Sequence, residues 1–461
     1  MNLTRRRFLT LTAVAALTPR LVIASEQNVA GVRRIRLVAR EVSRYMLDES
    51  TQTNLWEYSE AELRLRQGQP VEIEFVNELS QPSSVHWHGL RIDNAMDGVT
   101  GLTQDAVQPG DSFVYRFTPQ DAGTFWAHTH HQTSEQLARG LYLPLIVEEE
   151  NSTGYDQDLV MMLDDWRIKQ DGQIDLDSLN NMHDWSHSGR LGNVLTVNKK
   201  LDARFEVTAG DRVRVRLINA ANARVMTIKV PVPGWILAKD GQPLPQVSPI
   251  PGALDIAPAE RYDLTMDIPN EPGATLPMGF IHQGEFYQIA QMVIGERTGP
   301  AVVRDTPSRL PANPIALPNP DSSDLKLTLE MEGGAMRWLP EAIYKGERLD
   351  GRELMQHQQA WAFNGVANIP EDPMFDMPKG STLEIELINS TRWAHAMHVH
   401  GHHFESTSPN YPQGSLHDTL LMAPGERVTI RMLADNPGKW LLHCHMIEHQ
   451  MSGMKTWFNI S

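Results

Sequence analysis

Apolar and polar residues alternate with a period of two in three similar segments of the chain. Each segment begins at a glycine, runs through alternating apolar and polar side chains, and ends at an asparagine, at residues 68–77, 210–219 and 380–389. A period of two is typical of a strand that buries one face. The three segments therefore predict three equivalent strands.

A second repeated pattern follows each of these strands. Residues 108–117, 257–266 and 423–432 each place a turn before another alternating run. In the first and third copies, a glycine and an aromatic residue then lead into histidines, at residues 123–128 and 438–443. The repeats predict three copies of one all-β unit, each a sandwich of antiparallel sheets.

The repeats also predict how the chain is divided into domains. A length of 461 residues suits several domains, each with its own core. We expect three sandwich domains, at residues 25–150, 151–299 and 323–461. The proline-rich stretch 300–322 lacks periodicity and is expected to be an extended linker.

Residues 1–24 have the pattern of an export signal. Arg5, Arg6 and Arg7 form a basic stretch, a short apolar run at residues 11–17 follows, and Ala24 offers a small residue for cleavage. A basic N-terminal arm would lack that apolar run, so the pattern indicates a twin-arginine signal peptide, a periplasmic location and contact with the twin-arginine export machinery. The run is too short to span a bilayer, and no other segment approaches about 20 apolar residues, so no stable membrane insertion is expected.

Charge and cysteine content narrow the classes of protein further. The net charge of −16 argues against nucleic acid as a partner. Cys444 is the sole cysteine, so an internal disulfide is excluded. The thiol must therefore either take part in chemistry or pack in the core.

Cys444 lies between two histidines in the last twenty residues. In a strand, His443 and His445 would share one face and Cys444 would point to the other. His449 and Met454 follow at a spacing that, with one further imidazole, gives the His₂Cys site with a weak axial thioether of a blue copper. For this stretch alone, a buried structural cysteine beside unrelated histidines is the alternative.

Histidines cluster at three other places in the chain. Each cluster contains a His-x-His pair, which can place two imidazoles on one face of a strand. One such pair would equally fit exposed or core histidines, but four pairs at matching places in the first and third domains indicate metal ligands, and residues 224–230 of the second domain contain no histidine. Counting ligands assigns His395 to the site of Cys444 and leaves eight histidines for a second site between two domains: His86, His88, His128, His130, His398, His400, His443 and His445.

In order and spacing, these clusters resemble the signatures of the multicopper oxidases, over nearly the whole chain that follows the signal. The resemblance implies three consecutive cupredoxin-like Greek-key β-sandwich domains and a bacterial enzyme of laccase-like or copper-resistance type. It implies four copper ions, one of type 1, one of type 2 and two of type 3. It assigns the type 1 copper to His395, Cys444, His449 and Met454, the type 2 copper to His86 and His398, and the type 3 pair to His88, His128, His130, His400, His443 and His445.

The resemblance also implies a reaction between O₂ and a small reducing substrate. The reductant would lose one electron at a time at the type 1 copper, and Cys444 would pass these electrons to His443 and His445, near which O₂ is reduced to water. A methionine as axial ligand is expected to lower the type 1 potential and to favour easily oxidised substrates.

Two positions bear on the supply of protons. Asp97 stands where the family has a carboxylate near the type 2 copper, which makes it a candidate catalytic residue beside Cys444; an ordinary Asp-Gly turn is the equal alternative. Gln450 stands where many bacterial relatives carry a glutamate, and an amide cannot do acid–base work. Either Glu448, which is expected to face elsewhere, or water replaces that group, or turnover is slow.

The sequence leaves two chemical classes of reductant, an aromatic compound and Cu(I). Trp393 offers an apolar wall for a phenol or aromatic amine, and we favour this laccase-like activity. A periplasmic cuprous oxidase for copper tolerance is the alternative, because thioethers bind Cu(I) and Met331, Met336 and Met355 lie in one segment; a long insert rich in Met and His is absent. A non-catalytic copper-binding cupredoxin-like protein is disfavoured because every ligand position is filled.

Overall fold

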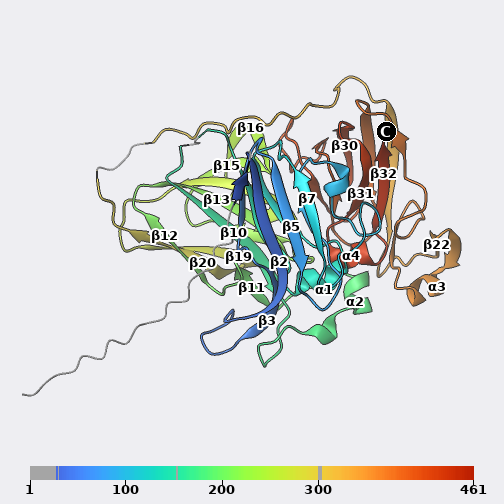
Figure 1. The fold of residues 1–461 in the computed structure, drawn as a ribbon, viewed down its shortest axis with the longest axis horizontal. Helices are drawn as coiled ribbons and strands as arrows, with labels where there is room; N and C mark the ends of the chain where they lie inside the picture. The colour runs from blue at the N-terminus through green and yellow to red at the C-terminus, as the bar shows by residue number, and fades with distance from the viewer. Residues whose placement is uncertain (1–26, 30, 152–153, 300–303) are drawn as a thin grey trace, which may run out of the picture.

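The structure, a computed structural model, describes residues 27–461 except 30, 152–153 and 300–303. The twin-arginine stretch lies outside the described residues. The described chain is built mainly of strands, arranged as three β-sandwiches in chain order (Figure 1). The all-β prediction of three consecutive sandwiches is confirmed. In the described part, no helix is long and apolar enough to cross a membrane.

The first sandwich pairs a five-stranded sheet with a four-stranded sheet around one apolar core. The five-stranded sheet has the order β1 (Gln27–Val29), β2 (Val32–Arg44), β5 (Val71–Asn77) and β7 (Ser112–Phe117), with β3 (Thr53–Tyr58) beside β2. The other sheet has the order β4 (Leu63–Arg66), β9 (Tyr142–Glu148), β8 (Gly123–His128) and β6 (His86–His88). Two short helices, η1 (Asn94–Met96) and α1 (Thr133–Ala138), lie in its loops.

The second sandwich has a six-stranded and a five-stranded sheet. The first has the order β11 (Val194–Val197), β10 (Gln157–Trp166), β13 (Arg212–Asn219), β18 (Arg261–Asp267), β15 (Gly234–Lys239) and β16 (Gln242–Pro249). The second has the order β12 (Ala203–Thr208), β20 (Glu285–Gly295), β19 (Thr275–His282), β14 (Met226–Lys229) and β17 (Leu254–Ile256). Its helices are η2 (Leu176–Ser178) and α2 (Met182–Ser186).

The third sandwich has two five-stranded sheets. One has the order β24 (Trp361–Phe363), β21 (Leu325–Gly333), β26 (Thr382–Asn389), β30 (Arg427–Leu433) and β28 (Phe404–Ser406). The other has the order β25 (Asp376–Met377), β32 (Lys455–Ile460), β31 (Gly438–Cys444), β27 (His395–Val399) and β29 (Thr419–Met422). A hairpin of β22 (Glu341–Tyr344) and β23 (Glu347–Asp350), and the helices α3 (Gly351–Gln356) and α4 (Ile447–Met451), complete it.

The repeated sequence segments form equivalent strands in the three sandwiches. The first repeat becomes β5, β13 and β26, and the second repeat pairs antiparallel with it as β7, β18 and β30. The sheets are mixed rather than purely antiparallel, because the first long strand of each sandwich (β2, β10 and β21) lies parallel to the first repeat. A parallel pair needs a crossover connection, which local alternation does not reveal.

The three repeated asparagines fasten the same corner in each sandwich. Asn77, Asn219 and Asn389 are fully buried at the ends of β5, β13 and β26. Each side-chain amide donates to two backbone carbonyl oxygens at 2.7–3.0 Å, and each side-chain oxygen accepts the N–H of the residue two positions later at 3.0–3.1 Å. The asparagine therefore satisfies three backbone groups where the strand ends.

The connection between the second and third sandwiches contains no helix or strand at residues 304–324. Figure 1 shows it running along one edge of the molecule, in yellow to orange. Asn313 anchors it, since its side chain donates to the carbonyl of Ala122 (2.9 Å) and to the amide oxygen of Gln242 (3.0 Å). The domain boundaries themselves stay a prediction.

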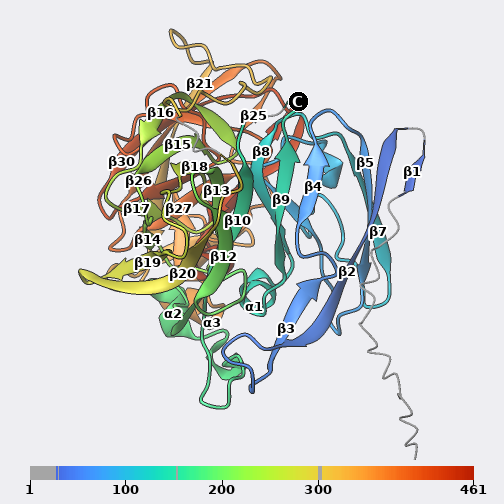
Figure 2. The same cartoon turned by 90° about the vertical axis from the view of Figure 1, so that its left-hand side faces the viewer.

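The sandwiches pack against one another through shared apolar residues. One buried cluster joins Trp126 and Tyr142 of the first sandwich to Trp166 and Ile218 of the second and to Ile447 of α4. The first and second sandwiches lie side by side in Figure 2, and α4 of the third sandwich contacts both α1 and α2. This packing brings strands β6 and β8 of the first sandwich close to β27 and β31 of the third.

Candidate metal centres

The first candidate site is a pocket inside the third sandwich, which we call the mononuclear pocket. It contains His395 at the start of β27, Cys444 at the end of β31 and His449 in α4. The register places Met397 opposite Cys444. His395 lies two residues before Met397, so His395 and Cys444 point to the same face of the paired strands. Met454 is fully buried in the same core cluster as Cys444. Its carbonyl accepts the N–H of Cys444 (3.0 Å), and its own N–H donates to the carbonyl of His449 (2.9 Å).

The side chains of the mononuclear pocket converge on a fully buried point. The Nδ1 atoms of His395 and His449 are 3.0 Å apart and lie 3.6 and 3.7 Å from the Cys444 Sγ. The opposite ring nitrogens are engaged elsewhere: Nε2 of His395 lies 2.8 Å from the Thr391 hydroxyl, and Nε2 of His449 lies 2.7 Å from the carbonyl of His187. A protonated Nε2 at each ring leaves both Nδ1 lone pairs facing the thiol.

Burial shifts the pKa values of this pocket towards neutral side chains. Burial and the neighbouring His449 hold the pKa of His395 well below its usual value, and burial lowers the pKa of His449 to about 4. Burial raises the pKa of Cys444 to about 12. Neutral imidazoles are the form that binds a metal. A thiol that ionises only at high pH on its own calls for a cation nearby to become a thiolate.

The second candidate site, which we call the interdomain cluster, gathers eight histidines from two sandwiches. The first sandwich supplies two from β6, one from the end of β8 and one from the loop after it, and the third sandwich supplies the rest from β27, β31 and the loops after these strands. All eight are buried, and the most exposed, His130, has 8% of its surface accessible. The eight are His86, His88, His128, His130, His398, His400, His443 and His445.

The imidazoles of the interdomain cluster face one another across the two sandwiches. His86 stacks on His400 with ring centroids 4.0 Å apart, and His88 stacks on His398 at 3.8 Å. Two further pairs approach through Nε2: His400 with His443 at 3.1 Å, and His445 with His128 at 3.4 Å. Overlapping groups of three ligand atoms within 4.8 Å of one another connect all eight rings.

The electrostatics of the interdomain cluster suit metal ions. Burial, together with repulsion between neighbouring imidazoles, holds the pKa values of most of these rings well below the usual value for histidine. Several rings direct Nδ1 to a backbone carbonyl at 2.8–3.0 Å, as His86, His128, His398 and His443 do. Among the described residues, Nε2 of His86, His130 and His398 has no hydrogen-bond partner. Buried lone pairs without partners are costly, and a metal ion satisfies them, so the residues fit copper.

Asp97 lies between the two sandwiches that build the interdomain cluster. Its Oδ2 is 2.9 Å from Nδ1 of His400, and its Oδ1 is 3.2 Å from Nδ1 of His86. It also precedes a tight turn, because Gly98 has φ +81° and a Cβ there would lie 1.8 Å from the carbonyl oxygen of Val85. Asp97 therefore both precedes a tight turn and contacts the cluster, so the two interpretations of this residue are compatible.

Glu448 and Gln450 lie in α4 with both side chains buried. The Glu448 carboxylate accepts the N–H of Arg190 (3.0 Å) and a hydrogen bond from the side-chain amide of Asn222 (2.9 Å). It therefore faces the second sandwich, in agreement with the expectation that it faces elsewhere than the cluster. Burial raises the pKa of Glu448. The amide oxygen of Gln450 has no hydrogen-bond partner among the described residues.

The three methionines that the sequence singled out are in different environments. Met355 is half-buried in α3. Met331 is fully buried in the same core cluster as Cys444, so it cannot meet a substrate. Met336 is 77% exposed, and the residue before it, Ala335, donates its N–H to the carbonyl of Ser186, the last residue of α2. Trp393 is half-buried, with its ring 5.1 Å from that of His187.

Sequence reasoning missed the groups that surround the ligands. Thr391 and the carbonyl of His187 orient the mononuclear pocket, and Asp418 and Arg261 lie against the interdomain cluster. None of these belongs to a histidine motif, and the contact of His449 with His187 is to a backbone atom. The sequence contained no signal for Arg261 either, because the burial of this arginine against an anionic partner depends on how the sandwiches pack.

Comparison with known proteins adds an independent line of evidence. Two family profiles, both described as multicopper oxidase, match residues 44–152 and 347–461. Multicopper oxidase MmcO from Mycobacterium tuberculosis is 27% identical over 429 residues, which cover 86% of this chain and 80% of that protein. The copper resistance protein A homolog of Pseudomonas syringae is 23% identical over 511 residues, with 85% and 86% covered.

Two solved structures are similar to this chain in both fold and sequence. Lac15 from a marine microbial metagenome is 35% identical, covers 92% of this chain and 99% of its own, and has a TM-score of 0.74. A multi-copper oxidase from Pseudomonas thermotolerans is 29% identical, with 93% and 99% covered and a TM-score of 0.81. The three sandwiches are thus cupredoxin-like, and the expectation of a copper-binding oxidoreductase is confirmed. From the identity to Lac15, the two profiles and the fold, the chain belongs to the multicopper oxidase family.

Proposed function

We propose that the chain couples one-electron oxidation of a small organic reductant at the mononuclear pocket to reduction of O₂ at the interdomain cluster. Copper, when bound as one type 1, one type 2 and two type 3 ions, supplies the one-electron transfers and the four-electron reduction of O₂ to water. The ligand sets proposed are those implied by the family: His395, Cys444, His449 and Met454 for type 1, His86 and His398 for type 2, and the other six cluster histidines for type 3.

The position of Cys444 in β31 carries the proposal. Its side chain points into the mononuclear pocket, while its sequence neighbours His443 and His445 belong to the interdomain cluster. The Nδ1 of His443 lies 2.9 Å from the carbonyl oxygen of Cys444 itself. One tripeptide therefore links the two sites through covalent bonds and one hydrogen bond.

Asp97 is the group we propose for holding protons near the interdomain cluster. Its carboxylate contacts rings from both sandwiches and is almost fully buried. A carboxylate in this place can fix which nitrogen of His400 carries the proton, and can accept or release a proton during reduction of O₂. Gln450 cannot take part in this exchange, because its amide does not ionise.

An open cleft beside the mononuclear pocket is the proposed docking place of the reductant. It has a volume of about 280 Å³ and lies between the second and third sandwiches. Ala394 and Met446 form part of its wall, and these residues neighbour His395 and Cys444 in the chain. Phe280 adds an aromatic ring, and the guanidinium of Arg224 is neutralised by Asp165 at 2.7 Å. An uncharged aromatic reductant, a phenol or aromatic amine, suits this lining.

The proposal is tested by loading the purified protein with copper and adding a phenol. We expect a blue protein with about four copper ions per chain that consumes O₂ only when the phenol is present. A colourless protein after loading would refute the proposal and leave a non-catalytic copper-binding protein. The control is the metal-free protein, which should neither be blue nor consume O₂.

A cuprous oxidase is the second candidate, favoured by the copper-resistance relative and by exposed Met336. Turnover of a phenol and turnover of Cu(I) should be compared in Met336→Leu and Trp393→Leu. Loss of Cu(I) turnover alone in Met336→Leu would establish Cu(I) as the substrate at this surface. Loss of phenol turnover alone in Trp393→Leu would establish the organic reductant. Met331 is unsuitable for this test because its replacement would disturb the core.

We further propose that the chain acts in the periplasm after twin-arginine export of a folded protein. The paired arginines and apolar run of the first 24 residues support this location. The three-domain division at residues 25–150, 151–299 and 323–461 belongs to the same proposal.

A further inference from the structure

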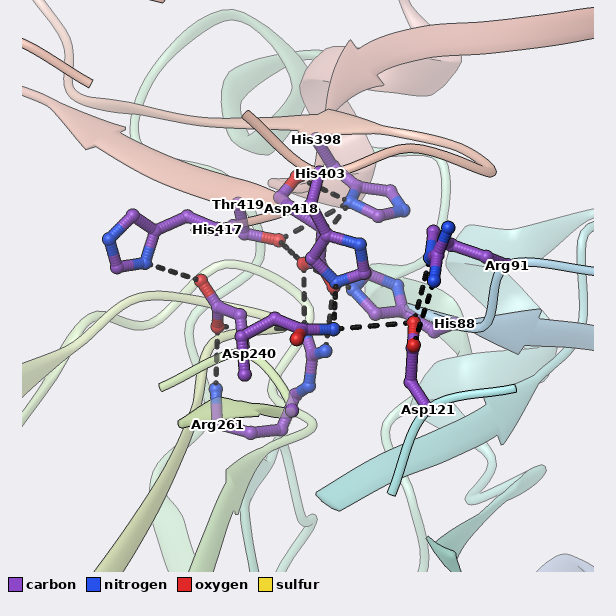
Figure 3. Close-up of polar contacts among 12 residues, drawn as sticks. His88, Arg91, Asp121, Asp240, Arg261, His398, His403, His417, Asp418 and Thr419 are labelled. Carbon is purple, nitrogen blue, oxygen red and sulfur yellow. Dashed lines mark hydrogen bonds and ion pairs between the residues drawn. The ribbon is translucent and has the colours of Figure 1, made fainter. Parts of the chain in front are cut away.

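A buried ionic cluster lies where the three sandwiches meet, and Asp418 is at its centre (Figure 3). Asp418 directly precedes β29 of the third sandwich and has no accessible surface. Its two carboxylate oxygens accept hydrogen bonds from Nη1 and Nη2 of Arg261, at 2.7 and 2.6 Å. Arg261 begins β18 of the second sandwich and is also fully buried. The pair is therefore a bidentate bridge between two sandwiches.

The same carboxylate reaches histidines of the interdomain cluster from two different sandwiches. Asp418 Oδ1 lies 3.4 Å from Nε2 of His88 in the first sandwich and 3.6 Å from Nδ1 of His398 in the third. The backbone carbonyl of Asp418 accepts the Nδ1–H of His398 at 2.8 Å. This bond leaves Nε2 of His398, which has no partner among the described residues, as a lone pair directed into the cluster.

The remaining donors of Arg261 are used by backbone atoms of the first and second sandwiches. Nε donates to the carbonyl of Thr124 at 3.2 Å, and Nη1 donates to the carbonyl of Ala259 at 3.2 Å. A second carboxylate, Asp240, accepts the backbone N–H of Arg261 at 3.1 Å and lies 3.5 Å from Nη1. The guanidinium is thus held in one orientation by all three sandwiches.

The chain next to His88 is shaped to admit this ion pair. Gly89 has φ +86°, and a Cβ at this position would lie 2.4 Å from Nη2 of Arg261 and 2.7 Å from Oδ2 of Asp418. A side chain there would displace the ion pair or the strand that carries His88. The absence of a Cβ lets the backbone beside His88 approach the ion pair closely.

Stability alone does not explain two charges in so dry a place. Removing a carboxylate and a guanidinium from water costs several kcal/mol for each ion, and a well-packed apolar pair of similar volume is often as stable. An ion pair with fixed geometry specifies orientation instead. Here the oriented groups are histidines of the interdomain cluster.

We propose that this ion pair positions His88 and His398, so that the second sandwich, which supplies no cluster histidine, controls the assembly of the interdomain cluster. Arg261 acts through Asp418 and is a positioning residue. The mononuclear pocket lies apart from this contact and should form without it. The inference rests on the proposed function in one respect, that copper is the metal bound.

The test replaces Arg261 and counts copper. Metal-free wild-type protein and Arg261→Met are loaded with copper ions alone, and copper per chain and blue absorption are measured. We expect Arg261→Met to retain the blue absorption but to bind about one copper ion per chain, where the wild type binds about four. The matched control is Arg214→Met, because Arg214 is an equally buried arginine of the same sheet that pairs with Asp263 and Glu149 rather than with Asp418.

Arg261→Lys keeps the test decisive if Arg261→Met does not fold. Lysine keeps the charge but cannot form both bonds to one carboxylate, so we expect the copper affinity of the interdomain cluster to fall about tenfold while blue absorption is unchanged. Wild-type copper binding in the Arg261 variants, or the same loss of copper in Arg214→Met, would overturn the inference. Failure of the wild type itself to bind about four copper ions would instead count against the proposed function.

Discussion

The mononuclear pocket and the interdomain cluster both use histidine, but they present opposite ring nitrogens to the site. In the mononuclear pocket, His395 and His449 present Nδ1 to the centre and bond Nε2 to a hydroxyl or a backbone carbonyl. In the interdomain cluster, rings such as His86 and His398 bond Nδ1 to a backbone carbonyl, and their Nε2 atoms have no hydrogen-bond partner in the part of the chain that the structure describes. The hydrogen-bond partner of each ring therefore decides which nitrogen is available to a metal.

The two sites also differ in how they are assembled. The mononuclear pocket takes the side chains of His395, Cys444 and His449 from one sandwich, and the second sandwich contributes only the backbone carbonyl of His187 among the hydrogen-bond partners described above. The interdomain cluster needs β6 and β8 of the first sandwich and β27 and β31 of the third, and it is held in contact with the second through Arg261. We therefore expect disturbed domain packing to damage the interdomain cluster more than the mononuclear pocket.

Cys444→Ser should have the largest effect, because it damages the mononuclear pocket and leaves the interdomain cluster intact. Removing the thiol removes the sulfur that gives a blue copper its colour and links it to His443 and His445. We expect turnover of a phenol to fall by more than about a thousandfold and the blue absorption to disappear. Copper bound by the interdomain cluster should remain, as metal analysis would show. Persistent blue colour would contradict the ligand role of Cys444.

The metal-free protein should lose stability as the pH falls below about 6.5. The pKa values of most cluster histidines are lowered in the folded state, so the unfolded chain takes up protons that the folded chain cannot. The free energy of unfolding should therefore decrease with falling pH, by up to about 1.4 kcal/mol per pH unit for each such imidazole.

Thermal unfolding at pH 8 and pH 5.5 measures this effect. Asp240, with its pKa raised to about 6 chiefly by burial, contributes in the opposite direction, because protonation near that pH favours the folded state. Asp164 and Glu448, whose pKa values burial also raises, act in the same direction as Asp240. Each such carboxyl group offsets about one imidazole, and the imidazoles with lowered pKa values outnumber them, so the net change keeps its sign. The copper-loaded protein, whose ring nitrogens are occupied, is the control and should show a shallower dependence. An equal melting temperature of the metal-free protein at both pH values would refute the expectation.

Asp97→Asn should have the smallest of the three effects and should act on the interdomain cluster alone. The amide has the shape of the carboxyl group but cannot accept a proton. We expect turnover to fall about 10- to 100-fold, with blue absorption unchanged. Asp93→Asn is the matched control, since Asp93 is an exposed residue of the same loop. A change in blue absorption in Asp97→Asn would show that the two sites are not independent.

Sequence patterns revealed what is local and missed what is assembled. Alternation predicted β5, β13 and β26. In β13, however, the alternating arginines are buried too, and Arg214 and Arg216 pair with Asp263, so alternation located this strand without revealing that both of its faces are covered. The histidine pairs were visible because period two places both rings on one face. Arg261 and Arg427 occupy the same place in their repeats, yet Arg261 is fully buried against Asp418, 157 positions away, while the Arg427 side chain is 63% exposed. Only the packing of the sandwiches distinguishes these two arginines. The parallel strand pairs were missed because local alternation does not reveal a crossover connection.

The buried asparagine corner has a consequence for evolution and for engineering. Asn219 secures the middle sandwich with the same bonds as Asn77 and Asn389, although residues 224–230 contain no histidine. Foldability and metal chemistry are therefore encoded at separate positions. After duplication of a unit, one copy can lose its ligands and take up another duty without losing its architecture. The same separation offers a designer the middle copy as a scaffold on which new ligands can be grafted.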